Sequence, residues 1–159
     1  MQNPIHRRKF LSNLTLGSAG ALAFPYLSKG THHASAASKL NVACVGIGHM
    51  GNAAVKDALT ENMAALCDVD WRPDESIWGD RNPAKTVADN PQSEQFTDYR
   101  KMLDKMHKDI DVVQISTPDH THFPIAMAAM EHGKHVFVQK PLAHNIWQLR
   151  TLQKAAHHY

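Results

Sequence analysis

The stretch LNVACVGIGHMG, residues Leu40–Gly51, decides the fold of this chain of 159 residues. Its first half is a short, continuous apolar run, which is typical of a β-strand buried on both faces of a sheet. Its second half fits the pattern G-x-G-x-x-G and runs into a segment with helical composition. Glycine clusters also occur in ordinary turns. Between a buried strand and a helix, however, the pattern predicts the first strand–turn–helix unit of a parallel sheet.

Apolar runs and helical segments alternate along the rest of the chain. We expect strands in residues 40–46, 62–70, 111–117 and 134–139, and helices in residues 48–61, 98–109, 121–133 and 145–159. Residues 72–96 contain three prolines and resist assignment, although a third strand is expected near Glu94–Thr97. Strands that alternate with helices pair in parallel. The sequence therefore predicts an α/β fold, a Rossmann-type doubly wound sheet with helices on both faces.

The N-terminal segment resembles a twin-arginine export signal. Positive charge at Arg7, Arg8 and Lys9 precedes a modest apolar stretch over Leu11–Leu27, and Ala34-Ser35-Ala36 offers the small residues that a signal peptidase needs. The apolar stretch is too short and too polar for a transmembrane anchor, which needs about 20 apolar residues. A disordered basic tail is the other alternative.

We expect residues 1–36 to be this signal, although His6 and Ser12 depart from its usual pattern. The twin-arginine translocase would then export the protein already folded, to the periplasm or another extracytoplasmic space. No stable membrane anchor is expected. Residues 37–159 would form one domain, and their 123 residues are enough for a proper core.

The net positive charge of the chain comes from residues 1–36, the expected leader. The leader would hold four of the 17 Lys and Arg and none of the 15 Asp and Glu, so the remainder carries 13 basic against 15 acidic residues. The sequence pI of about 8.6 therefore does not indicate a nucleic-acid partner.

Two cysteines, Cys44 and Cys67, lie inside apolar runs. An oxidising destination would allow a disulfide, but a protein that folds in the reducing cytoplasm buries such residues as thiols. We expect free, unreactive cysteines.

The glycine pattern predicts a dinucleotide site. Gly46 would permit the tight turn, Gly48 would let backbone approach a pyrophosphate, and Gly51 would let the helix pack on the strand, with the helix N-terminus facing the phosphates. Asp68, 22 residues after Gly46, would accept hydrogen bonds from the adenosine ribose and repel a 2′-phosphate. NAD is therefore favoured, while Arg72 leaves NADP open. Alternatively, Asp68 is only a turn residue at the end of a strand.

The segment STPDHTH, residues 116–122, ends the next predicted strand and should point at the same cleft. His120 and His122 have the spacing of a metal-binding pair, but no third ligand lies nearby in the sequence. We therefore expect no metal site.

Lys140 ends the strand that begins near His135. Strand alternation places it on the face of Val136 and Val138, and Pro141 ends the sheet there. A lysine partly shielded from water releases its proton more readily, which suits proton transfer. Strand spacing alone favours the alternative, a solvated lysine at a strand end.

Together, VGIGHMG, CDVD and STPDHTHFPIAMAAMEHGKHVFVQKPLAHN resemble the N-terminal domain of the glucose-fructose oxidoreductase, inositol dehydrogenase and MocA-like family, over about residues 39–159. The resemblance implies that the pyrophosphate lies on Gly46, Ile47, Gly48, His49, Met50 and Gly51 and the ribose on Asp68. It further implies that Ser116, Thr117, Pro118 and His122 follow the ribose and nicotinamide, with Gln139 and Lys140 beside the nicotinamide. Lys140 would take part in substrate binding and proton transfer. Gln139 stands where the family usually has Glu, and Asp119 where it often has Asn.

The resemblance also implies an exported NAD(P)-dependent oxidoreductase with tightly bound NAD, acting on a sugar, a polyol or a related carbohydrate. The family has a second, α+β substrate domain, which we do not expect these 159 residues to contain. We therefore expect residues 37–159 to be an incomplete N-terminal part of a longer, homo-oligomeric protein, or the product of a truncated reading frame. Two alternatives stay open: a glycosidase or lyase that oxidises its sugar transiently with retained NAD, although its lysine motif differs, and a non-catalytic dinucleotide-binding fragment.

Overall fold

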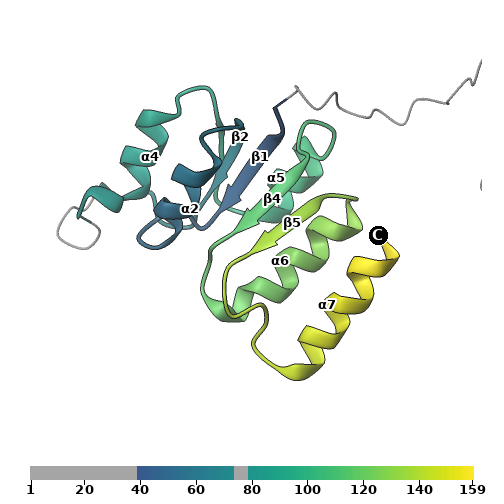
Figure 1. Ribbon diagram of the computed structural model, residues 1–159. Coiled ribbons are helices and arrows are strands. Elements are labelled where there is room, and N and C mark those ends of the chain that lie inside the picture. The colour runs from purple at the N-terminus through teal and green to yellow at the C-terminus, as the bar shows by residue number, and fades with distance from the viewer. Residues whose placement is uncertain (1–38, 74–78) are drawn as a thin grey trace, which may run out of the picture. The chain divides into compact units, whose positions relative to one another are not determined.

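Five parallel strands form one sheet in the order β3-β2-β1-β4-β5, in a computed structural model that describes residues 39–73 and 79–159 (Figure 1). The strands are β1 (Asn41–Val45), β2 (Asn62–Cys67), β3 (Glu94–Phe96), β4 (Val112–Ile115) and β5 (His135–Val138). The helices are α2 (Gly51–Ala58), η1 (Gly79–Arg81, a short 3-10 helix), α4 (Pro83–Asp89), α5 (Tyr99–Met106), α6 (Asp119–Glu131) and α7 (Ile146–His158). The expected export signal lies outside the described residues.

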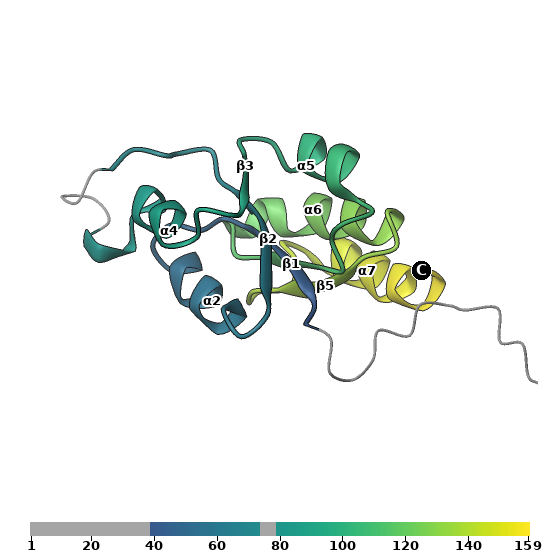
Figure 2. The ribbon, with the colours of Figure 1, turned by 90° about the horizontal axis from the view of Figure 1, so that it is seen from above.

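Helices cover both faces of the sheet, with α2 and α4 on one side and α5 and α6 on the other (Figure 2). Strand alternation explains these two layers. In β1, Ala43 and Val45 join one buried cluster with residues of α5, α6 and α7, while Val42 and Cys44 join a second cluster with α2 and α4. The predicted doubly wound Rossmann-type fold is confirmed.

Local capping explains several helix ends. The Asp98 side chain caps α5 by accepting a hydrogen bond from the Arg100 backbone N–H. Gly133 ends α6 with a φ of 69°, a conformation that glycine adopts without a steric penalty. The third strand also lies where it was expected, since β3 occupies Glu94–Phe96.

Sequence reasoning missed helix α4 in the proline-rich segment. Asn82 caps this helix by accepting a hydrogen bond from the Lys85 N–H at 2.7 Å, and Pro83 occupies its first turn. A proline is tolerated there because the first N–H groups of a helix have no partner within it. The pair Asn82-Pro83 was therefore a helix-start signal rather than a sign of irregular structure.

Both cysteines are buried free thiols, as expected. Cys44 and Cys67 belong to different clusters on opposite faces of the sheet, which prevents a disulfide between them. Burial raises the pKa of Cys44 to about 12. Burial, followed by the carboxylates of Asp68 and Asp98, raises the pKa of Cys67 to about 12.

Within residues 39–73 and 79–159, no helix combines the length and the apolarity that crossing a bilayer requires.

We expect neither thiol to react with a disulfide reagent at about pH 8 in the folded protein, because the thiolate is the reactive form. Both should react after unfolding. Since the folded state favours the neutral thiol, its contribution to stability is complete below the unfolded pKa of 9.0 and is lost as the pH rises towards about 12. Counting labelled thiols before and after denaturation checks this, and rapid labelling of the native protein would contradict it.

Candidate functional site

The turn between β1 and α2 is closed so tightly that two of its positions accept only glycine. Gly46 has a φ of 80°, and a Cβ there would lie 2.8 Å from the carbonyl carbon of Ser116 and 2.8 Å from the nitrogen of Thr117. A Cβ on Gly51 would lie 2.0 Å from the carbonyl oxygen of Gly46. The turn therefore packs against itself and against the end of β4, with the N-terminus of α2 at its open side.

Asp68 holds this turn in place. One of its carboxylate oxygens accepts hydrogen bonds from the N–H groups of Ile47 at 2.8 Å and Gly48 at 3.3 Å. Its other oxygen accepts the N–H of Asp70 at 3.1 Å, which makes it a turn residue as well. Its contact with a ribose stays a prediction. The carboxylate nevertheless lies at the loop, where such a contact requires it.

A second carboxylate lies two residues further on. Asp70 accepts two hydrogen bonds from the Arg72 guanidinium, at 2.8 and 2.6 Å. Together with the Arg72 backbone N–H, these bonds lower the pKa of Asp70 to about 2. Arg72 was the residue that kept NADP possible as the cofactor in the sequence analysis, and its guanidinium is thus paired with a carboxylate.

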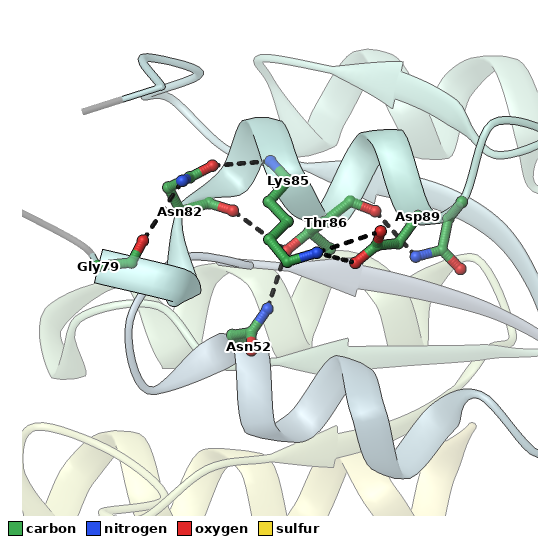
Figure 3. A network of polar contacts seen from close by, with 7 residues as sticks. Asn52, Gly79, Asn82, Lys85, Thr86 and Asp89 are labelled. Atoms are coloured by element: carbon green, nitrogen blue, oxygen red, sulfur yellow. Dashed lines mark hydrogen bonds and ion pairs between the residues drawn. The ribbon is translucent and has the colours of Figure 1, made fainter. Parts of the chain in front are cut away.

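A buried polar network ties the missed helix α4 to the first turn of α2 (Figure 3). The amide of Asn52 donates to the Thr86 hydroxyl at 2.9 Å, and that hydroxyl donates to the Asn82 carbonyl at 3.4 Å. The backbone N–H of His49 also donates to the Arg81 carbonyl at 2.9 Å. The segment from η1 to α4 therefore supports the glycine turn from outside.

Two adjacent cavities lie over the carboxyl ends of the strands, where ligands of open α/β sheets bind. The first has a volume of about 460 Å³ and is lined by Gly48, His49, Met50, Asp68, Val69, Asp70, Pro83, Ser116, Thr117 and Pro118. The second has a volume of about 480 Å³ and is lined by Val45, Gly46, Cys67, Asp68, Val69, Thr97, Asp98, Tyr99, Arg100, Thr117, Pro118, His120, Thr121 and Ile125. Four residues line both cavities: Asp68, Val69, Thr117 and Pro118.

Ser116 supplies an independent sign of a polar ligand. Its hydroxyl is the one buried side-chain polar atom without a hydrogen-bond partner in the part of the chain that the structure describes. Such a group costs about 1–3 kcal/mol when it is left unsatisfied. The Cβ of Ser116 lies 3.3 Å from the Cβ position of Gly51, so the hydroxyl lies beside the glycine turn. The turn, the helix N-terminus, Asp68 and this hydroxyl fit a dinucleotide.

Not all of the predicted cofactor residues line the cavities. Ile47 packs its side chain into the core and contributes its N–H to Asp68. His122 is buried between two backbone segments. Gln139 turns back to accept the Lys140 N–H at 2.9 Å and lines a separate groove against α2. The contacts of these residues with the cofactor stay predictions.

Lys140 lies at the end of β5, beside the end of β4. The Gln139 N–H donates to the Ile115 carbonyl at 2.9 Å, which brings the segment before Lys140 next to the segment before Ser116. The Lys140 side chain is exposed in this structure. Its part in proton transfer stays a prediction.

The site contains a segment that sequence reasoning did not assign to it. Thr97, Asp98, Tyr99 and Arg100 line the second cavity because they follow the carboxyl end of β3. The rule that ligands lie beyond strand ends could have found them, but it required a confident position for β3. Among the described residues, no group of three His, Cys, Asp or Glu side chains could hold a metal ion.

We expect Gly51→Ala to weaken NAD binding by at least about 100-fold, because the added methyl group displaces the Gly46 carbonyl and opens the turn. Gly133→Ala is the matched control. Its Cβ would meet nothing within 4 Å, so only its positive φ is strained, at a cost of about 1 kcal/mol. Calorimetric titration with NAD checks both variants. Equal affinities would show that the turn does not hold the cofactor.

Comparisons with known proteins agree with this geometry. The profile of the GFO_IDH_MocA family, described as an oxidoreductase family with an NAD-binding Rossmann fold, matches residues 40–159. A glycosyl hydrolase family 109 protein of Shewanella putrefaciens is 32% identical over 91% of this chain and 36% of its own length. Levoglucosan dehydrogenase of Pseudarthrobacter phenanthrenivorans is 38% identical over 65% of this chain and 27% of its own.

Among solved structures, scyllo-inositol dehydrogenase of Lactobacillus casei with bound NAD(H) and scyllo-inositol has a TM-score of 0.58 and 25% identity, over 76% of this chain and 34% of that one. The chain thus spans about a third of the length of these proteins. The turn, the sheet order and these matches lead to one conclusion: this chain belongs to the GFO_IDH_MocA oxidoreductase family and contains its NAD-binding Rossmann domain.

Proposed function

We propose that this chain is the dinucleotide-binding part of an exported oxidoreductase that transfers a hydride between NAD and a carbohydrate hydroxyl or carbonyl. The observation that carries the proposal is the closed glycine turn, held by Asp68 and packed on the end of β4. A sugar or polyol is supported by the relatives named for levoglucosan and scyllo-inositol.

The charges of the site favour NAD over NADP. Asp68 and Asp70 place two carboxylates at the end of β2, and a 2′-phosphate bound there would meet both of them. Arg72, which would offset this repulsion, is paired with Asp70, whose pKa of about 2 keeps that partner ionised.

The chemistry at the carbohydrate requires one proton transfer. When bound, NAD supplies the hydride acceptor or donor. Lys140 in its neutral amine form would take the proton from the carbohydrate hydroxyl as the carbonyl forms, and its ammonium form would return the proton in the reverse direction. Its position after β5 supports this role, because the Gln139 N–H donates to the Ile115 carbonyl and so brings the strand end before Lys140 next to Ser116.

A second function is favoured by the glycosyl hydrolase match. A glycosidase that retains NAD would oxidise a sugar hydroxyl, which acidifies the neighbouring C–H, then eliminate the leaving group, add water and reduce the carbonyl again. This cycle has no net redox change and would use the same dinucleotide site, although the lysine motif of such glycosidases differs from the one in this chain. The hydrolase relative matches 91% of the chain, and therefore extends into the segment before residue 39.

Export of a folded, loaded protein would explain how an NAD-dependent domain works outside the cytoplasm. The cofactor is made inside the cell, so it must be bound before export. Support comes from Arg7 and Arg8 ahead of an apolar stretch, as a twin-arginine signal requires. We propose that NAD is tightly retained for this reason.

Cell fractionation followed by denaturation tests the cofactor and the location together. We expect the protein in the extracytoplasmic fraction, and we expect mass spectrometry to detect released NAD. Absence of dinucleotide, with no binding at about 1 mM NAD or NADP, would overturn the cofactor assignment. Protein found solely in the cytoplasm would overturn export.

A panel of sugars, polyols and aryl glycosides then separates the two functions. A dehydrogenase forms NADH in proportion to product, whereas the glycosidase releases sugar without added NAD and without accumulating NADH.

We expect Lys140→Ala, in the protein as it is encoded, to lower turnover by about 100- to 10,000-fold, the usual range for loss of an acid–base group. Bound NAD should remain, since the glycine turn is unchanged. Lys154→Ala is the control because Lys154 is exposed on α7, away from the strand ends. Steady-state kinetics and the content of bound cofactor are the measurements. Unchanged turnover would exclude the proton-transfer role.

A further inference from the structure

His122 joins the backbone segment after β4 to the segment after β5, at the carboxyl ends of the strands. It lies in the first turn of α6 and is only 1% exposed. Its Nε2 lies 2.7 Å from the carbonyl oxygen of Thr117, which follows β4. Its Nδ1 lies 2.7 Å from the carbonyl oxygen of Pro141, next to Lys140. We call this arrangement the His122 bridge.

The bridge has a chemical requirement, because both partners are acceptors. A carbonyl oxygen cannot donate, and a neutral imidazole has only one N–H. The other ring nitrogen would then direct a lone pair at an oxygen 2.7 Å away, which is repulsive. The doubly protonated ring donates to both carbonyls. These distances are also those of hydrogen bonds from a charged donor.

Few charged groups lie on the segments that hold the ring. On the two segments that hold it, the titratable groups are Asp119 and His120 in the first turn of α6, and Lys140 and His144 after β5, all of them exposed. The N-terminus of α6 disfavours a cation. Two charge-assisted hydrogen bonds favour the cation. The ring is buried, so hydrogen bonds to water cannot replace these two bonds.

We propose that His122 is a positioning residue whose imidazolium form connects the backbone after β4 to the Lys140–Pro141 segment and so fixes Lys140 beside the cofactor site. Loss of the ring proton removes one of the two hydrogen bonds. The bridge is therefore complete at lower pH and weakens as the pH rises. The proposal rests on the proposed function only where it concerns turnover by Lys140.

Nuclear magnetic resonance of the full chain, labelled with ¹⁵N in histidine and in the backbone, tests the bridge without any turnover. His122→Gln assigns the ring signals. We expect both His122 nitrogens at the chemical shift of protonated imidazole nitrogens. On raising the pH, the amides of Lys140 and Leu142 should shift with the same midpoint as the ring. A neutral ring throughout, or segment amides that do not follow the ring, would overturn the proposal.

Two variants connect the bridge to catalysis. His122→Phe keeps a ring without donors, and we expect kcat to fall at least tenfold, by a larger factor than the affinity for NAD falls. His122→Gln can still donate to one carbonyl, so it should recover part of that loss and should lack the alkaline decline of the wild-type pH profile. His157→Gln, on the exposed end of α7, should behave as wild type.

A wild-type pH profile in His122→Gln would overturn the positioning role. If the proposed function fails, the protein shows no NAD-dependent turnover, yet the magnetic resonance result still decides the bridge. If the bridge fails, release of NAD and the effect of Lys140→Ala are unaffected.

Discussion

The backbone of the β1–α2 turn lies against the backbone after β4 with no room for a side chain, and the site depends on this contact. A methyl group at Gly46 would overlap Ser116 and Thr117, and one at Gly51 would overlap Gly46 itself. Two segments that are 70 residues apart in the sequence thereby form one wall. The N-terminus of α2 and the unpaired hydroxyl of Ser116 lie along this wall, within reach of one ligand.

Asp68 has two functions at this wall. Its carboxylate accepts two N–H groups of the turn, so the turn cannot relax without losing charge-assisted hydrogen bonds. The same carboxylate is part of both cavities, and Asp70 adds a second charge beside it. Under the proposed function, the residue that stabilises the turn would therefore also disfavour a phosphorylated ribose.

Most of the fold could be predicted because strands and helices have local signals. The apolar runs located β1, β2, β4 and β5, and the segments of helical composition located α2, α5, α6 and α7. Helix α4 was missed because its proline was taken as a sign of irregular structure, although a proline in the first turn of a helix is favourable. The polar network that this helix makes with α2 could not be predicted, since it joins side chains that are 34 residues apart.

The sequence by itself determined the strand–turn–helix order, the position of the glycines and the acidic end of β2, because each depends on a few neighbouring residues. Only the tertiary structure decided what these residues contact. It showed Asp68 bonded to the turn, Lys140 in solvent, and His122 buried between Thr117 and Pro141. These properties depend on which strand ends lie side by side, and that order follows from packing of the whole sheet.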